Sequence, residues 1–179
     1  MSLFLATLLV GLVLLLLGVV LAADTSFVRA ALKAFPRSQT AAYLLFGGAA
    51  AWFLSRVAVL SEADFGQFRN QLFIGFAVVA VLAFFYVKEF LAVRGLAALI
   101  LLAAGPLLAT AFGLYEVPAR LFMVSAVYLA LTAALVIGAQ PWRLRDAIEW
   151  LQRVPGRARL VGSAFAAYGL LLVGIAFTY

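Results

Sequence analysis

Few side chains of this chain are suited to chemistry, and their spacing provides no catalytic set. The hydroxyl groups inside its apolar stretches belong to Ser55, Thr110, Ser125, Tyr128, Thr132, Ser163 and Tyr168. Each of them can donate a hydrogen bond to a backbone carbonyl one helical turn back. A hydroxyl nucleophile needs an adjacent base, and the apolar stretches place neither a lysine nor paired carboxylates beside one. We therefore predict that the protein is not an enzyme.

Cysteine and histidine are both absent from the sequence. Their absence excludes disulfides, zinc held by cysteine or histidine, haem held by histidine, and iron–sulfur clusters. It also removes any proton relay built on imidazole. We expect the protein to hold no cofactor and no metal ion.

Arg56 is the most deeply placed ionisable residue of the apolar stretches, and none lies near the centre of a stretch. Arg56 is about four residues from the nearer end, so at a rise of 1.5 Å per residue its side chain can reach a membrane surface. The alternative is an ion pair with Glu62, Asp64 or Glu116 from a neighbouring helix. Glu116 and Arg120, four residues apart, predict a local ion pair at a helix start.

Gly105 and Pro106 stand together near the middle of another apolar stretch, one turn before Thr110. Proline inside a helix removes one backbone hydrogen bond and frees a carbonyl, while glycine makes bending easier. Interrupted helices of this kind form substrate sites in some transporters. They are also tolerated as simple kinks in ordinary membrane helices. Gly105, Pro106 and Thr110 are therefore a candidate substrate site, with a kink as the plainer interpretation.

The composition places the whole chain in a membrane. Of the 179 residues 68% are hydrophobic and 11% are charged, and the mean hydropathy is +1.17. A soluble domain is about half apolar and about a quarter charged. The net charge of +6 would suit nucleic acid in a soluble protein. Here the basic residues cluster in short connections, where membrane topology and anionic headgroups favour them, so we expect no nucleic-acid partner.

Six apolar segments are long enough to cross a bilayer, which takes about 20 residues. They cover residues 2–23, 40–60, 70–87, 95–115, 118–139 and 160–179. We therefore predict an all-α polytopic bundle of about six transmembrane helices, forming a single transmembrane domain over residues 1–179. The first segment lacks the basic start of a signal peptide and is longer than the usual apolar core of one, so we expect it to be retained.

The distribution of basic residues predicts the orientation of these helices. Ten of the 13 basic residues lie in the first, third and fifth connections; they are Arg29, Lys33, Arg37, Lys88, Arg94, Arg143, Arg145, Arg153, Arg157 and Arg159. The positive-inside rule places these connections in the cytoplasm and both termini on the non-cytoplasmic side. We expect the membrane to be a bacterial-type inner (plasma) membrane.

Two cytoplasmic connections have the pattern of amphipathic helices, at about residues 25–35 and 141–153. The first has an apolar stripe of Phe27, Val28, Ala31, Leu32 and Phe35, and the second has one of Leu144, Ala147, Ile148 and Leu151. Asp24 or Thr25 can cap the first, and Pro36 can end it. Such helices lie in the membrane interface, either as anchors or as docking sites for a cytoplasmic partner.

Small and aromatic residues mark possible contact faces. Gly47 and Ala51, Gly162 and Ala166, and Gly11 and Gly18 recur at spacings that keep each pair on one side of a helix, where helices can approach closely. The third segment is rich in aromatic residues, namely Phe73, Phe76, Phe84, Phe85 and Tyr86, followed by Phe90. Exposure to lipid is the simplest explanation of these aromatic residues. The more specific alternative is contact with a quinone, a carotenoid or another protein chain.

Two functions remain open on these observations. The first is a non-catalytic accessory or structural subunit of a larger integral membrane complex, because the chain lacks catalytic groups and has minimal connections. The second is a small oligomeric transporter or channel for a neutral or weakly polar solute, with its site near Gly105 and Pro106. Both hypotheses expect the lipid bilayer and other membrane subunits, identical or different, as partners.

Overall fold

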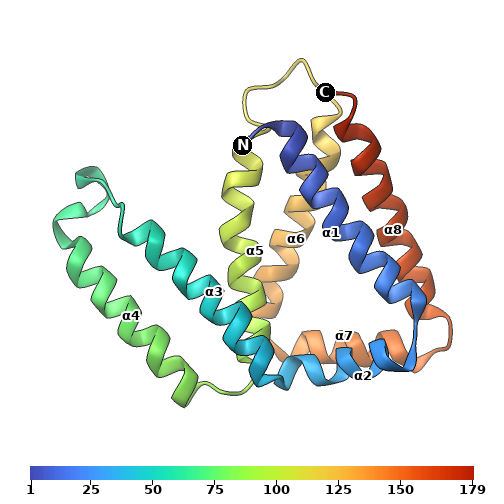
Figure 1. Cartoon of the computed structure of the whole chain (residues 1–179), viewed down its shortest axis with the longest axis horizontal. Coiled ribbons are helices and arrows are strands. Elements are labelled where there is room, and N and C mark those ends of the chain that lie inside the picture. Colours follow the sequence, from blue (N-terminus) through green and yellow to red (C-terminus); the bar gives the residue numbers. More distant parts are fainter. The chain divides into compact units, whose positions relative to one another are not determined.

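The computed structural model describes all residues, Met1–Tyr179, and the fold is entirely helical with no strand (Figure 1). The α-helices are α1 (Leu3–Ala23), α2 (Ser26–Ala34), α3 (Gln39–Val57), α4 (Arg69–Tyr86), α5 (Leu91–Ala109), α6 (Arg120–Ala139), α7 (Trp142–Arg153) and α8 (Arg157–Ala176). Short 3-10 helices cover Phe35–Arg37, Glu62–Asp64 and Gly66–Phe68.

Each of the six predicted apolar segments contains one long helix, but their ends differ from the prediction. The largest difference is in α5, which begins at Leu91 and ends at Ala109 rather than at residues 95 and 115. Arg94 does not delay the start, because a charged side chain can project from a first helical turn. At the other end, residues 110–119 form turns with Gly113 at φ = +79°, a backbone conformation that a helix cannot continue through.

Five helical segments are long and apolar enough to cross a membrane. They are α1, α5, α6, α8 and the segment Gly66–Tyr86, which contains α4. Helix α3 has 19 residues but a lower mean hydropathy, because it contains Gln39, Ser55, Arg56 and two glycines. The two predicted connector helices are present as α2 and α7. Six membrane spans, and an interfacial position for α2 and α7, stay predictions.

The chain forms two compact units. Unit 1 comprises Met1–Lys33, Ala103–Ala133 and Arg145–Tyr179, and unit 2 comprises Ala34–Leu102 and Ala134–Leu144. Helices α5 and α6 each contribute one part to each unit. The prediction of a single transmembrane domain stays a prediction.

In unit 1, α1 and α8 pack antiparallel with their backbones in direct contact (Figure 1). Four glycines make this approach possible: Gly11 and Gly18 on α1, and Gly162 and Gly169 on α8. A Cβ atom on Gly18 would lie 2.6 Å from the carbonyl oxygen of Gly162, and one on Gly169 would lie 2.7 Å from that of Gly11. Since real Cβ atoms do not approach that closely, only glycine fits.

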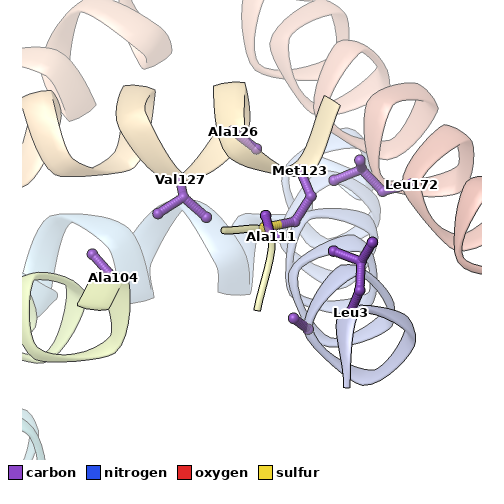
Figure 2. Packing of buried hydrophobic residues seen from close by; sticks show 8 residues of the cluster. Leu3, Ala104, Ala111, Met123, Ala126, Val127 and Leu172 are labelled. Atoms are coloured by element: carbon purple, nitrogen blue, oxygen red, sulfur yellow. The ribbon is translucent and has the colours of Figure 1, made fainter. Parts of the chain in front are cut away.

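The core of unit 1 lies where α1, α5, α6 and α8 contribute small and aliphatic side chains (Figure 2). Met123 of α6 and Leu172 of α8 are both fully buried in it, among Leu3, Ala6, Ala104, Ala111, Ala126 and Val127. The hydroxyl of Tyr168 donates a 2.9 Å hydrogen bond to the carbonyl of Phe122 and so ties α8 to α6.

Unit 2 packs α3 against α4 and against the first part of α5. Gly95 of α5 lies on the backbone of Phe46, where an added Cβ would be 2.6 Å from the Phe46 Cα. The Phe84 ring of α4 stacks on Tyr43 at 5.3 Å and meets Phe46 edge-on at 5.3 Å. Helix α4 itself has no buried residue. It is held by aromatic contacts and by the packing of Ala83 against the cluster of Ala42, Leu91 and Ala92, and most of its other residues are exposed.

Candidate functional site

Gly105 and Pro106 of the predicted substrate site lie within a continuous helix, and Thr110 directly follows its last residue. Helix α5 runs from Leu91 to Ala109 with Pro106 inside it. No atom lies within 4 Å of a Cβ built on Gly105. In the turn after α5, the Thr110 hydroxyl donates a 2.6 Å hydrogen bond to the carbonyl of Leu107. A substrate site at Gly105, Pro106 and Thr110 stays a prediction.

Arg56 makes no ion pair. It lies in the last turn of α3, and within unit 2 neither Glu62 nor Asp64 comes within 4.0 Å of it. Asp64 instead accepts a 2.9 Å hydrogen bond from the Ser61 hydroxyl. Glu116, the third partner considered, belongs to unit 1. Arg56 is left to reach solvent or headgroups.

The local ion pair predicted between Glu116 and Arg120 is wrong. Helix α6 begins only at Arg120, so residues 116–119 are not helical and a spacing of four does not bring the side chains together. The guanidinium of Arg120 donates instead to the carbonyl of Ala111 and lies 4.9 Å from the centre of the Tyr115 ring. The Arg120 side chain thus stabilises the turn before α6 and forms no ion pair with Glu116.

The predicted helix-packing positions differ in what they contact. Gly162 and Ala166 lie against α1 at Gly18. A Cβ on Gly47 would be 3.9 Å from the Phe84 ring, which is ordinary contact. Ala51 is exposed.

Asp24 forms a buried charge cluster that the sequence did not reveal. Its side chain is 4% exposed and accepts hydrogen bonds from Arg29 Nε at 2.8 Å and Nη2 at 2.6 Å, while Arg159 Nε lies 3.8 Å away. The hydrogen bonds from Arg29 hold the pKa of the Asp24 carboxyl below its ordinary value, although burial opposes them. Gln152 adds a 3.0 Å hydrogen bond to the Arg29 carbonyl. The cluster thereby connects the end of α1 to helices α2 and α8, and Gln152 connects α7 to α2.

Sequence patterns gave Asp24 only a capping role, and the structure shows otherwise. The cap of α2 is Thr25, whose hydroxyl oxygen accepts from the Val28 amide at 3.3 Å. Asp24 has a left-handed backbone with φ = +47°, which is uncommon for a residue other than glycine. Its partner Arg159 comes from a distant part of the sequence, so no local spacing signals the cluster. Because all of its strong acceptors are occupied, we interpret it as a structural clamp.

An open feature of unit 2 is formed by α3, α4 and α5. It consists of two cavities that follow one another along these helices, which together we name the α3–α4–α5 cleft. The mouth cavity has a volume of about 440 Å³ and is lined by Pro36, Arg37, Ser38, Gln39, Ala42, Tyr43, Val81, Phe84, Phe85, Lys88, Leu91 and Ala92. The inner cavity has about 330 Å³ and is lined by Phe46, Ala49, Ala50, Phe53, Leu54, Phe76, Val79, Ala80, Ala98, Leu101 and Leu102.

The two cavities of the cleft differ in chemistry. The charged and hydrogen-bonding side chains of the cleft all line the mouth; they are Arg37, Ser38, Gln39, Tyr43 and Lys88. The inner cavity is lined by alanine, aliphatic and phenylalanine side chains alone. Both volumes are in the range of small-molecule sites. The arrangement can hold a polar or anionic group at one end and an apolar group behind it.

Comparisons with known proteins identify no relative: no protein-family model, no curated protein and no solved structure matches the chain.

Proposed function

We propose that the chain is a polytopic membrane protein of about six spans that serves as a non-catalytic accessory or structural subunit of a larger integral membrane complex. The outer face of α4 carries this proposal. Ile74, Val78 and Leu82 are 62%, 51% and 45% exposed, and their spacing places them on the side of α4 opposite the inner cavity. A stripe of branched aliphatic side chains on a helix with no buried residue suits another membrane helix.

The membrane placement rests on the five helical segments that are long and apolar enough to cross a bilayer. The basic connections support cytoplasmic positions for α2 and α7 and non-cytoplasmic termini. Helix α2 has no buried residue and α7 has only Ile148, while Trp142 and Trp150 of α7 are about half exposed. Exposed tryptophans favour the headgroup region. These features support an inner-membrane protein with two interfacial helices.

The test uses the absence of native cysteine. Val78→Cys places a single thiol on the outer face of α4, and Leu129→Cys places one on α6, where the native side chain is 71% exposed. After cross-linking in the native membrane, purification in mild detergent and mass spectrometry, we expect Val78→Cys to join one other membrane polypeptide in fixed stoichiometry. Leu129→Cys is the matched control and should not.

The alternative, an oligomeric transporter or channel with its site at Gly105 and Pro106, predicts a different result. The purified chain alone would then move a neutral solute across liposomes, and Pro106→Ala would change the rate. Transport by the isolated chain, together with cross-links only between its own copies, would refute the accessory-subunit proposal.

A further inference from the structure

The mouth of the α3–α4–α5 cleft carries positive charge that the protein does not neutralise. Arg37 approaches it from the chain before α3, and Lys88 approaches it from the chain after α4. Neither cation lies within 4.0 Å of a carboxylate, and no acidic residue lines the mouth. Glu89 does not line the mouth; together with Lys88 and Arg94 it lines a neighbouring cavity beside Pro141 and Trp142. The mouth is therefore suited to an anion.

Neutral donors at the mouth add to the two cations. Ser38 Oγ accepts a hydrogen bond from the Ala41 amide at 3.2 Å, which leaves its hydroxyl hydrogen free to donate. Gln39 is exposed, and its side-chain amide is not hydrogen-bonded within the protein. Phosphate oxygens accept several hydrogen bonds, and an arginine fork matches two of them at once.

Behind the mouth the cleft offers only apolar surface. The rings of Phe46 and Phe84 lie 5.3 Å apart, edge to face, between the two cavities. Deeper along the same helices, Phe53 and Phe76 meet at 5.0 Å. Ala49, Ala50 and Ala80 keep the inner cavity open between these aromatic pairs. A flexible hydrocarbon chain fits a space of this lining, whereas a polar solute would lose its hydrogen bonds there.

The length of the cleft matches one leaflet of a bilayer. Its lining runs along α3 from Ser38 at the mouth to Leu54 in the inner cavity. At 1.5 Å per residue this is about 24 Å. One leaflet, with its headgroups, is roughly 20–22 Å thick. A molecule with a charged head at Arg37 and a hydrocarbon tail reaching Leu54 therefore has the dimensions of a membrane lipid.

We infer that the α3–α4–α5 cleft binds one anionic phospholipid of the surrounding bilayer, with its phosphate at Arg37 and Lys88 and one acyl chain in the inner cavity. Zwitterionic lipids carry their own cation, which the uncompensated charge of the mouth disfavours, and free phosphate would leave the inner cavity unused. The proposed topology puts Arg37 and Lys88 at the cytoplasmic leaflet, where anionic lipids give a negative surface potential. The inference rests on the membrane placement proposed above, but not on the accessory role.

The test compares lipids retained by the full chain. The purified protein is reconstituted in nanodiscs of phosphatidylglycerol and phosphatidylcholine in equal amounts, released into mild detergent and examined by native mass spectrometry. The wild-type chain should retain one phosphatidylglycerol. Arg37→Gln with Lys88→Gln removes the charge-assisted hydrogen bonds and should reduce that retention by more than about tenfold. Lys33→Gln with Arg153→Gln, which changes net charge equally at two exposed cations outside the cleft, should leave it unchanged.

A second pair of variants tests the acyl chain. Ala50→Phe fills the inner cavity, whereas Ala51→Phe adds the same ring one residue later, on an exposed position outside the cleft. Retention should fall with Ala50→Phe and persist with Ala51→Phe. Retention that is equal for the two lipids, or unaffected by the mouth variants in protein that has entered the nanodisc, overturns the lipid site and leaves the membrane placement standing. Failure of the wild-type chain to enter a bilayer overturns both.

Discussion

Replacing Gly162 by alanine should destabilise unit 1 at the contact between α1 and α8. The new Cβ would lie 2.7 Å from the Gly18 carbonyl oxygen and 2.8 Å from the Leu21 carbonyl carbon. Both neighbours are backbone atoms, so no side-chain rotation relieves the clash. The Cβ would lie closer still to the Ala22 amide nitrogen. Ordinary contacts begin at about 3.4 Å, so the helices must separate by about 1 Å, which forfeits up to about half of the dispersion energy of the contacts they share.

The expected cost of Gly162→Ala follows from two opposing terms. Overpacking a close-fitting contact costs about 1–3 kcal/mol, while alanine improves helix propensity over glycine by up to about 1 kcal/mol. Membrane helices associate through close packing rather than hydrophobic burial, so the lost fit is not compensated by exclusion of water. We therefore expect a net loss of about 1–2 kcal/mol in the free energy of unfolding.

The assay is equilibrium unfolding of the purified protein in mixed micelles with increasing sodium dodecyl sulfate. Gly174→Ala is the matched control, because Gly174 is on the same helix and a Cβ there meets no atom within 4 Å. The control should unfold at the same detergent fraction as the native chain or a higher one. If Gly162→Ala and Gly174→Ala unfold together, the backbone contact between α1 and α8 does not exist in solution and the reasoning is refuted.

Three further predictions follow from single contacts. Hydrogen bonds from Arg29 lower the pKa of Asp24, so the Asp24 carboxylate stabilises the fold fully above its ordinary pKa of 3.8 and progressively less as pH falls below that value. Asp24→Asn should therefore reduce the loss of stability that the native chain shows at acid pH. An unchanged loss would contradict the structural role of the Asp24 cluster. Tyr168→Phe removes the hydrogen bond to Phe122 and should cost about 0.6–1.7 kcal/mol in the same unfolding assay; no change would mean that the bond is not formed. Single cysteines at Gln67 and at Gln152 should react with a membrane-impermeant maleimide from opposite sides, and labelling from one side would exclude the six-span topology.

The sequence predicted the helices well because their main determinant is local. Uninterrupted apolar stretches of about 20 residues specify long helices whatever their neighbours are, and a spacing of seven correctly kept Gly11 and Gly18 on one side of α1. The prediction from sequence failed where residue spacing assumed a helical backbone that the chain does not form. Glu116 and Arg120 have helical spacing, but the chain between them turns, so Arg120 binds the Ala111 carbonyl instead.

The candidate site was not predictable from spacing. The cleft depends on the spacing of three helices: the Phe84 ring of α4 meets Phe46 of α3, and Gly95 lets α5 approach the Phe46 backbone closely. Arg37 and Lys88 were identified only as topology signals, in two separate connections. Their meeting at one cavity is a tertiary property. The substrate site that the sequence predicts at Gly105 and Pro106 has a chemical rationale and stays a prediction.

The pairing of α1 with α8 also constrains the order of events during synthesis. Gly18 leaves the ribosome roughly 140 residues before Gly162, which at 5–20 residues per second is about 7–28 s. During that interval the glycine face of α1 has no native partner, and any intermediate contact must be weak enough to be exchanged when α8 arrives. A nascent chain that stops before α8 therefore exposes the same glycine face that α8 covers in the finished protein.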